Sequence, residues 1–208
     1  MTREECRTAV KTATDHDGAS DTQVTTAQLN TWIDIEHKLL RRLLAQVAPQ
    51  LYTAADNSQT ISSGTESLTM PSDFERLIRL EIQVGDRWLP IEVSDELSPH
   101  IGTLAVREEG GTLKVAPGAL TAGTYRIIYV QKPTTLSADS GAGGVLLVPD
   151  GCEDIIVEKV AARVRERLDE DPTPHLNRAA ATWKEQKSAL RRRYGKAPQP
   201  GMRTTRRW

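Results

Sequence analysis

The chain has 208 residues, of which 38% are hydrophobic, 26% charged and 4% aromatic. This length suits one elaborated domain or two small ones, and so few aromatic residues argue against a large aromatic-lined ligand pocket. No run of 18 apolar residues occurs, so we expect no transmembrane helix and no membrane partner.

The formal net charge of −1 conceals an uneven distribution of charge. Seven of the 27 basic residues lie in the last eighteen positions, where no acidic residue occurs: Arg191, Arg192, Arg193, Lys196, Arg203, Arg206 and Arg207. The rest of the chain carries 20 basic against 28 acidic residues. This split predicts an acidic body with a cationic arm, and a solvated tail is the simplest alternative for that arm.

The first segment, residues 1–57, is predicted to hold two helices. Thr2 with Glu5, and Thr25 with Gln28, have the spacing of capping boxes at helix starts. Apolar residues then recur at helical spacing until Pro49 ends the pattern. The stripe is Leu29, Trp32, Ile33, Glu36, Leu40, Leu43, Leu44 and Val47. Trp32 is interpreted as a core or subunit-interface residue.

Residues 58–148 are predicted to form an antiparallel β module. Residues 77–84 alternate in polarity, as in a strand buried on one face, and Gly85-Asp86 then marks a two-residue turn. Pro90 cannot donate to a ladder, so its strand should be an edge or carry a bulge. Residues 125–130 are apolar on both faces, which is typical of a central strand. The pattern indicates six or seven short strands in a small sandwich or barrel.

Residues 149–195 are predicted to form a second helical pair, and residues 196–208 an extended basic tail. The last helix is expected to present one stripe: Leu176, Ala180, Trp183, Lys187, Leu190 and Tyr194. The predicted fold class is therefore α+β. N- and C-terminal helices form a bundle into which a small antiparallel β-sandwich or barrel is inserted.

The sequence offers no catalytic set, cofactor motif or metal-ligand spacing. The four histidines are isolated, and Asp15–Asp21 fails the calcium-loop pattern because glycine is misplaced and Thr26 stands where a glutamate belongs. Cys6 and Cys152 lie too far apart to suggest a secreted disulfide framework and are interpreted as buried apolar residues. Paired carboxylates lie in turns or at helix ends, where ionisation is ordinary. We therefore predict no enzyme activity, no cofactor and no metal.

Five short motifs follow one another along the chain. They are the helix start Thr26-Ala27-Gln28-Leu29-Asn30, the segment Met70-Pro71-Ser72-Asp73-Phe74, the strand Leu113 to Pro117, the strand Tyr125 to Tyr129, and Lys132 to Leu136. In this order, over most of the chain, they resemble bacteriophage head-to-tail connector (adaptor) proteins. The long basic tail departs from that pattern.

The resemblance implies a structural virion protein of the neck, assembled in the host cytoplasm and located between capsid and tail. In such adaptors twelve copies form a ring between the portal protein and the distal neck or tail proteins. Packaged DNA passes through the lumen without specific binding, which suits an acidic body because clustered Lys and Arg would bind phosphate tightly.

The expected partner-binding residues lie at the C-terminal end: Arg191, Arg192, Arg193, Tyr194, Lys196, Arg203, Arg206, Arg207 and Trp208. Tryptophan and arginine are common interface anchors, so we expect residues 196–208 to be disordered in the monomer and to order on docking. Trp183 and Leu190 are the predicted subunit-interface residues. The alternatives are a nucleic-acid-binding protein that uses the basic arm and another phage neck or tail-completion protein.

Overall fold

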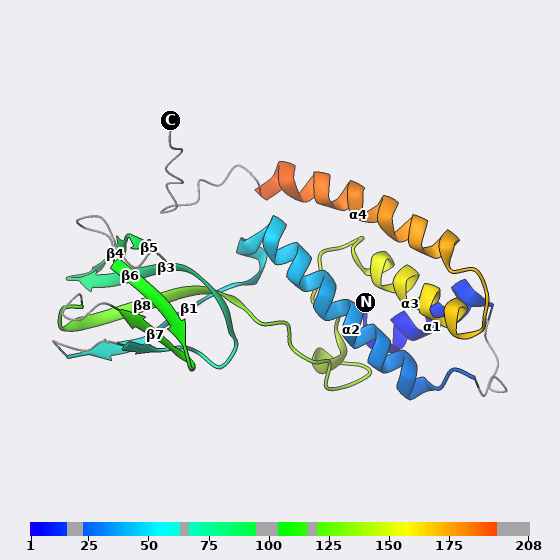
Figure 1. The fold of residues 1–208 in the computed structure, drawn as a ribbon, viewed down its shortest axis with the longest axis horizontal. Coiled ribbons are helices and arrows are strands. Elements are labelled where there is room, and N and C mark those ends of the chain that lie inside the picture. Colours follow the sequence, from blue (N-terminus) through cyan, green and yellow to red (C-terminus); the bar gives the residue numbers. More distant parts are fainter. Residues whose placement is uncertain (16–22, 63–66, 95–103, 116–119, 195–208) are drawn as a thin grey trace. The chain divides into compact units, whose positions relative to one another are not determined.

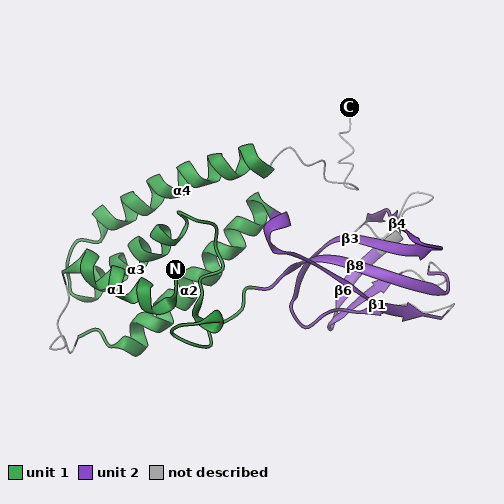
Figure 2. Cartoon of the chain, turned by 180° about the vertical axis from the view of Figure 1, so that it is seen from behind, with its two compact units in different colours: residues 1–48, 133–196 green, residues 49–132, 197–208 purple. Residues whose placement is uncertain are grey.

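The computed structural model describes residues 1–15, 23–62, 67–94, 104–115 and 120–194. These residues form two compact units (Figure 1, Figure 2). The helical unit combines Met1–Ala48 with Pro133–Lys196, and the β unit begins at Pro49 and runs to Lys132. The predicted α+β class is confirmed. The tail at residues 196–208 and most of the Asp15–Asp21 loop lie outside the described residues.

The two N-terminal helices begin where the sequence predicts. Helix α1 spans Arg3–Thr14 and helix α2 spans Thr26–Val47. Both capping boxes are formed, with Thr2 paired to Glu5 and Thr25 to Gln28. Each box satisfies two backbone N–H groups that the first helical turn leaves without partners.

The C-terminal half of the helical unit holds the short 3-10 helix η2 (Ala142–Gly144) and helices α3 (Glu153–Arg167) and α4 (Thr173–Tyr194). Helix α3 packs against α1, α2 and α4 and is therefore central in this unit. Its buried residues are Ile155, Ile156, Val157, Val160, Ala161, Ala162 and Val164. Cys6 and Cys152 are fully buried free cysteines beside this core.

The face that α4 buries differs from the predicted stripe in its first half. The residues that α4 buries are His175, Ala179 and Leu190, whereas Leu176 of the stripe is 48% exposed. The buried line begins at His175, whose Nδ1 lies 2.6 Å from the Glu158 carboxylate of α3. A pattern of apolar residues alone does not detect such a polar anchor.

In its described residues, the β unit contains a 3-10 turn and eight strands. They are η1 (Pro49–Tyr52), β1 (Thr53–Ile61), β2 (Ser67–Thr69), β3 (Phe74–Val84), β4 (Arg87–Ile91), β5 (Val93–Ser94), β6 (Leu104–Glu109), β7 (Thr112–Val115) and β8 (Gly123–Gln131). One sheet has the order β1-β8-β3-β4 and the other β2-β7-β6-β5. Strand β8 lies centrally between β1 and β3, as predicted from its two apolar faces.

The predicted turn at Gly85-Asp86 and the predicted edge strand are confirmed. Gly85, with a φ of 60°, leads the β3–β4 hairpin, and Gly110 with Gly111 joins β6 to β7. Strand β4 is the edge strand that Pro90 requires. Four details differ. The described residues hold eight strands rather than six or seven, and β1 begins at Thr53 rather than near residue 58. In addition, β5 pairs with β6 in parallel, and the described strands form no closed barrel.

The two sheets share one hydrophobic cluster that includes Leu68, Leu80, Leu113 and Ile127. The simple alternation predicted for β3 is interrupted, because register shifts occur between Phe74 and Arg76 and between Leu77 and Arg79. The outward strand residue Glu81 is only 3% exposed. Its carboxylate pairs with Arg79 and with Arg126 of the neighbouring strand, and these two side chains cover it.

The Met70–Phe74 motif connects β2 to β3 and is fastened to β8. Asp73 accepts hydrogen bonds from Tyr129 and Gln131, both at 2.8 Å, and the Phe74 ring stacks on Tyr129 with centroids 5.6 Å apart. Burial raises the pKa of Tyr129 to about 12, and the hydrogen bond to Asp73 adds to this effect. Two motifs that lie far apart in the sequence therefore form one structural joint.

Candidate functional site

Among the described residues, no three or more histidine, cysteine or acidic side chains lie close enough together to hold a metal ion. Within the same part of the chain, no helix is long and apolar enough to cross a bilayer. The prominent features of the helical unit are instead a polar junction, buried charges and exposed apolar side chains.

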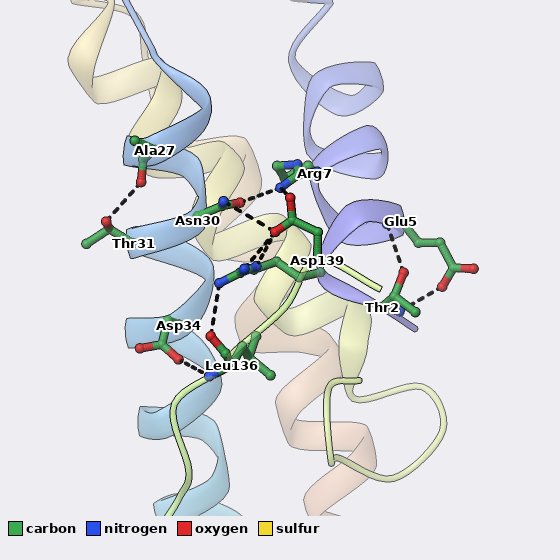
Figure 3. A network of polar contacts seen from close by, with 10 residues as sticks. Thr2, Glu5, Arg7, Ala27, Asn30, Thr31, Asp34, Leu136 and Asp139 are labelled. Atoms are coloured by element: carbon green, nitrogen blue, oxygen red, sulfur yellow. Dashed lines mark hydrogen bonds and ion pairs between the residues drawn. The ribbon is translucent and has the colours of Figure 1, made fainter. Parts of the chain in front are cut away.

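The polar junction fastens the segment after the β unit to α1 and α2 (Figure 3). Asp139 accepts from Arg3 Nε at 2.8 Å and pairs with Arg7 Nη1 at 2.7 Å. Arg7 also donates to Asn30 of α2 at 2.7 Å. Hydrogen bonds from the two arginines, first from Arg7, hold the pKa of Asp139 below its usual value although partial burial opposes this.

Backbone groups complete the same junction. The Leu136 N–H donates to Asp34 of α2 at 3.0 Å, and the Glu4 N–H donates to the Asp139 carbonyl at 3.0 Å. Further along, Thr2 and Val145 form an isolated β-bridge. The returning segment is thus held at several points and fixes the position of α1 beside α2.

Helix α2 also carries charged and polar groups on its inner face. Glu36 is 4% exposed and accepts from Arg163 Nε of α3 at 3.0 Å, with Lys159 at 3.4 Å. His37 is fully buried, and neither ring nitrogen has a hydrogen-bond partner among the described residues. Burial, aided by the charge of Arg41, lowers the pKa of His37 to about 4, so the ring is neutral near pH 7.

The described part of the predicted partner-binding segment lies at the end of α4. Arg191, Arg192 and Arg193 are exposed in its last turn, where cations interact favourably with the helix dipole. The Arg193 guanidinium lies 5.4 Å from the centre of the Tyr194 ring. The remaining predicted residues, Lys196, Arg203, Arg206, Arg207 and Trp208, lie outside the described residues.

The two predicted subunit-interface residues differ in exposure. Trp183 is partly exposed, with the Lys187 ammonium 5.9 Å from its ring centre. Leu190 is only 6% exposed and packs within the helical unit. Leu190 therefore offers little surface to a partner, whereas Trp183 keeps part of its ring accessible.

A second apolar face of α2 was not identified from the sequence. Ile35, Leu39 and Leu43 are 39%, 41% and 39% exposed, and they follow one another at intervals of four residues. The sequence does contain evidence of this face, because α2 has more apolar residues than one buried face requires. A helix that is apolar on opposite sides is normally covered on both.

The chain is therefore an α+β protein that exposes apolar side chains on α2 and basic side chains at the end of α4. A family model described as SU10 adaptor protein matches residues 1–207. The chain therefore belongs to the SU10 adaptor protein family, a family of phage adaptor (head-tail connector) proteins and not of enzymes. A search among curated proteins found no match to this chain.

Proposed function

We propose that this protein is a structural component of the virion neck. Copies of it form a ring, with twelve as the expected number, that joins the capsid portal to the tail and continues the DNA channel. The observation that carries the proposal is the family match over residues 1–207, which includes both the helical unit and the β unit.

The surfaces of the helical unit support this role. An exposed apolar face on α2 is a liability for a protein that stays alone, because contiguous apolar patches usually mark interaction sites. Ring formation by repeated contact between two different patches would cover such a face on every copy. Because this face consists of one row of partly exposed side chains, it fits association that depends on the portal rather than an obligate oligomer.

The basic C-terminal arm is proposed to bind the portal or a neighbouring copy. Arg191, Arg192 and Arg193 are exposed where the described structure ends, and they lead into the arm. In this proposal the arginines of the arm pair with acidic partner groups while Trp208 fills a pocket. The acidic remainder of the chain is consistent with a lumen that lets DNA pass without binding it.

The test is attachment to portal-bearing heads. Purified protein should be monomeric or weakly associated in light scattering at micromolar concentration, and should form rings on heads that can be counted by electron microscopy. Deleting residues 196–208 should strongly reduce ring occupancy. A stable ring of the free protein would contradict portal-dependent assembly, and unchanged occupancy after deletion would refute docking through the arm.

The same deletion also distinguishes the connector function from the nucleic-acid-binding alternative. Phosphate contacts release counterions, so DNA affinity through the arm would fall steeply with salt concentration. A connector with an acidic lumen should show weak DNA binding at physiological salt with or without the arm. Strong, salt-sensitive binding that disappears on truncation after Gly195 would favour the DNA-binding alternative.

A further inference from the structure

The exposed apolar residues of α2 form a continuous ridge. Thr31, Ile35, Leu39 and Leu43 are all exposed and lie four residues apart, which is the spacing of one ridge on a helix surface. The Thr31 hydroxyl donates to the Ala27 carbonyl at 2.9 Å. Because the Thr31 hydroxyl is already hydrogen-bonded within the helix, covering Thr31 with a partner would cost little desolvation energy.

A shallow, widely open groove runs along α1, and Thr2 and Ser140 belong to its lining. Two rows of residues line it, again four apart along the helix: Glu4, Thr8 and Thr12 in one row and Glu5, Ala9 and Ala13 in the other. Thr8 and Thr12 donate their hydroxyls to the carbonyls of Glu4 and Thr8, each at 3.1 Å. The floor of the groove is therefore formed by small side chains whose hydrogen-bonding groups are already occupied.

The first residue of the ridge and the first residues of the groove lie on opposite sides of the α1–α2 pair. In Figure 3, α1 and α2 lie side by side with Asp139 between them. Ala27 and Thr31 lie on the side of α2 away from α1, and Thr2 and Glu5 lie on the side of α1 away from α2. One copy cannot place its own ridge in its own groove, but a row of copies can do so repeatedly.

We propose that the α2 ridge of one copy docks into the α1 groove of the next copy. This inference rests on the proposed ring and assigns the faces that build it. A ridge of residues four apart fits between two such rows on another helix, which is a common packing mode with a crossing angle of about −50°. Large side chains on one face and small ones on the other make the contact heterologous, as ring closure requires.

Charges of opposite sign stand beside the two faces. Arg42 and Lys38 flank the C-terminal half of the ridge, with Lys38 also paired to Asp34 of its own helix at 2.7 Å, whereas Glu4 and Glu5 stand at the N-terminal end of the groove. A second copy of the chain therefore matches this ridge in shape, in apolar character and in charge. A basic or uniformly acidic partner would match only one of the two faces.

Paired cysteines test the contact directly. The variant Leu39→Cys/Ala9→Cys places one thiol on the ridge and one in the groove, on opposite sides of the same unit, so a disulfide must join two copies. The native thiols are fully buried, and burial raises the pKa of Cys6 to about 12 and that of Cys152 to about 11. On portal-bearing heads, mild oxidation should give a ladder of covalent multimers at least tenfold above that of Leu176→Cys/Ala9→Cys.

A charge placed on the ridge gives a second measurement. Leu39→Asp should reduce ring occupancy on heads at least tenfold while circular dichroism stays unchanged, because Leu39 is 41% exposed in the monomer. Leu89→Asp is the matched control, since Leu89 is 46% exposed on β4. Two results would overturn the proposed contact. One is normal ring formation with Leu39→Asp, and the other is rings of the paired-cysteine variant that give no covalent multimers on oxidation. Absence of wild-type protein from heads would instead refute the connector function.

Discussion

The helical unit and the β unit distribute polar and apolar groups differently. In the described part of the β unit, Glu81 is the one buried charged residue, and the shared cluster between the sheets is apolar. The helical unit buries Glu36, His37, Arg41 and His175, yet leaves a row of large apolar residues on the outside of α2. The β unit also exposes two large apolar residues, Val84 (55%) on β3 and Leu89 (46%) on β4. The two units therefore differ mainly in the charged and polar groups that the helical unit buries and in the regular row of exposed apolar residues on α2.

The buried charges bear on how the helices pack. A buried ion pair adds little net stability, but a charge buried without its partner is costly, so such pairs favour one arrangement of helix faces. In the helical unit, the Glu36–Arg163 ion pair joins α3 to α2, and the hydrogen bond between Glu158 and His175 joins α3 to α4. Apolar surface left outside is then available to a partner.

The largest expected effect comes from removing the β unit. Replacing residues 49–132 by a flexible Gly/Ser linker should leave a soluble protein with helical circular dichroism and one cooperative thermal transition. The excision follows the boundaries of the helical unit and retains Leu136 and Asp139. An aggregated or non-helical product would show that the helices depend on the β unit.

A longer excision provides the matched comparison. The β module predicted from the sequence spans residues 58–148, and excising residues 57–148 would remove all of it. That excision also removes the junction that Asp139 forms with Arg3 and Arg7. We expect the longer excision to lower the melting temperature relative to the shorter one, and equal melting temperatures would mean that the junction does not stabilise the helices.

A core substitution in β8 tests whether the units unfold separately. Ile127 is fully buried, so Ile127→Ala should cost about 3 kcal/mol through lost burial and an unfilled cavity. Amide hydrogen exchange in the β strands should accelerate roughly a hundredfold. The adjacent Ile128→Ala, which truncates a partly exposed residue, should have a smaller effect.

Thiol labelling reports on the other unit in the same experiment. Cys6 and Cys152 both lie buried in the helical unit, so they react only when that unit opens. Their labelling rate should be unchanged by Ile127→Ala. An increase equal to that of the β-strand amides would show that both units unfold as one.

The buried His37 gives the helical unit a pH dependence of its own. Its folded pKa, about 4, lies below the ordinary value of 6.5, so the unfolded chain binds more protons between these values. Stability conferred by neutral His37 is complete above pH 6.5 and declines as the pH falls toward 4, by about 2.5 kcal/mol at pH 4.5. His37→Leu should flatten urea-unfolding stability in this window, and identical pH profiles would contradict the assignment.

Local signals in the sequence sufficed for much of the fold. Capping boxes, Gly turns and the position of Pro90 each depend on a few neighbouring residues, and the structure confirms them. Buried polar anchors were missed because their burial depends on a distant partner. His175 requires Glu158, and Glu81 requires Arg126, and neither pair is visible in an apolar pattern.

The candidate surfaces were harder to predict than the elements. The expected anchors at the C-terminal end follow from composition alone, and of those only the part up to Tyr194 is described. The ridge on α2 emerges only when one knows which side of the helix faces α3. The predicted stripe separated Leu40 from Leu39, which are 3% and 41% exposed, but it also included Leu43, which is 39% exposed.

The smallest predicted effect concerns the start of α2. The Thr25 hydroxyl accepts from the Gln28 N–H at 3.2 Å, and the Gln28 side chain accepts from the Thr25 N–H at 2.8 Å. Thr25→Ala should cost about 1 kcal/mol because a helix N–H loses its partner, whereas Thr25→Ser retains the cap.

The matched substitution in the β unit is Thr60→Ala, at an exposed position of edge strand β1, which should change stability by less than about 0.5 kcal/mol. Urea unfolding followed by circular dichroism measures all three variants. If Thr25→Ala proves as neutral as Thr60→Ala, the first turn of α2 must be held by the Arg7–Asn30 hydrogen bond and the burial of Leu29 rather than by its cap. The ridge that begins one turn later would then be positioned by tertiary packing alone.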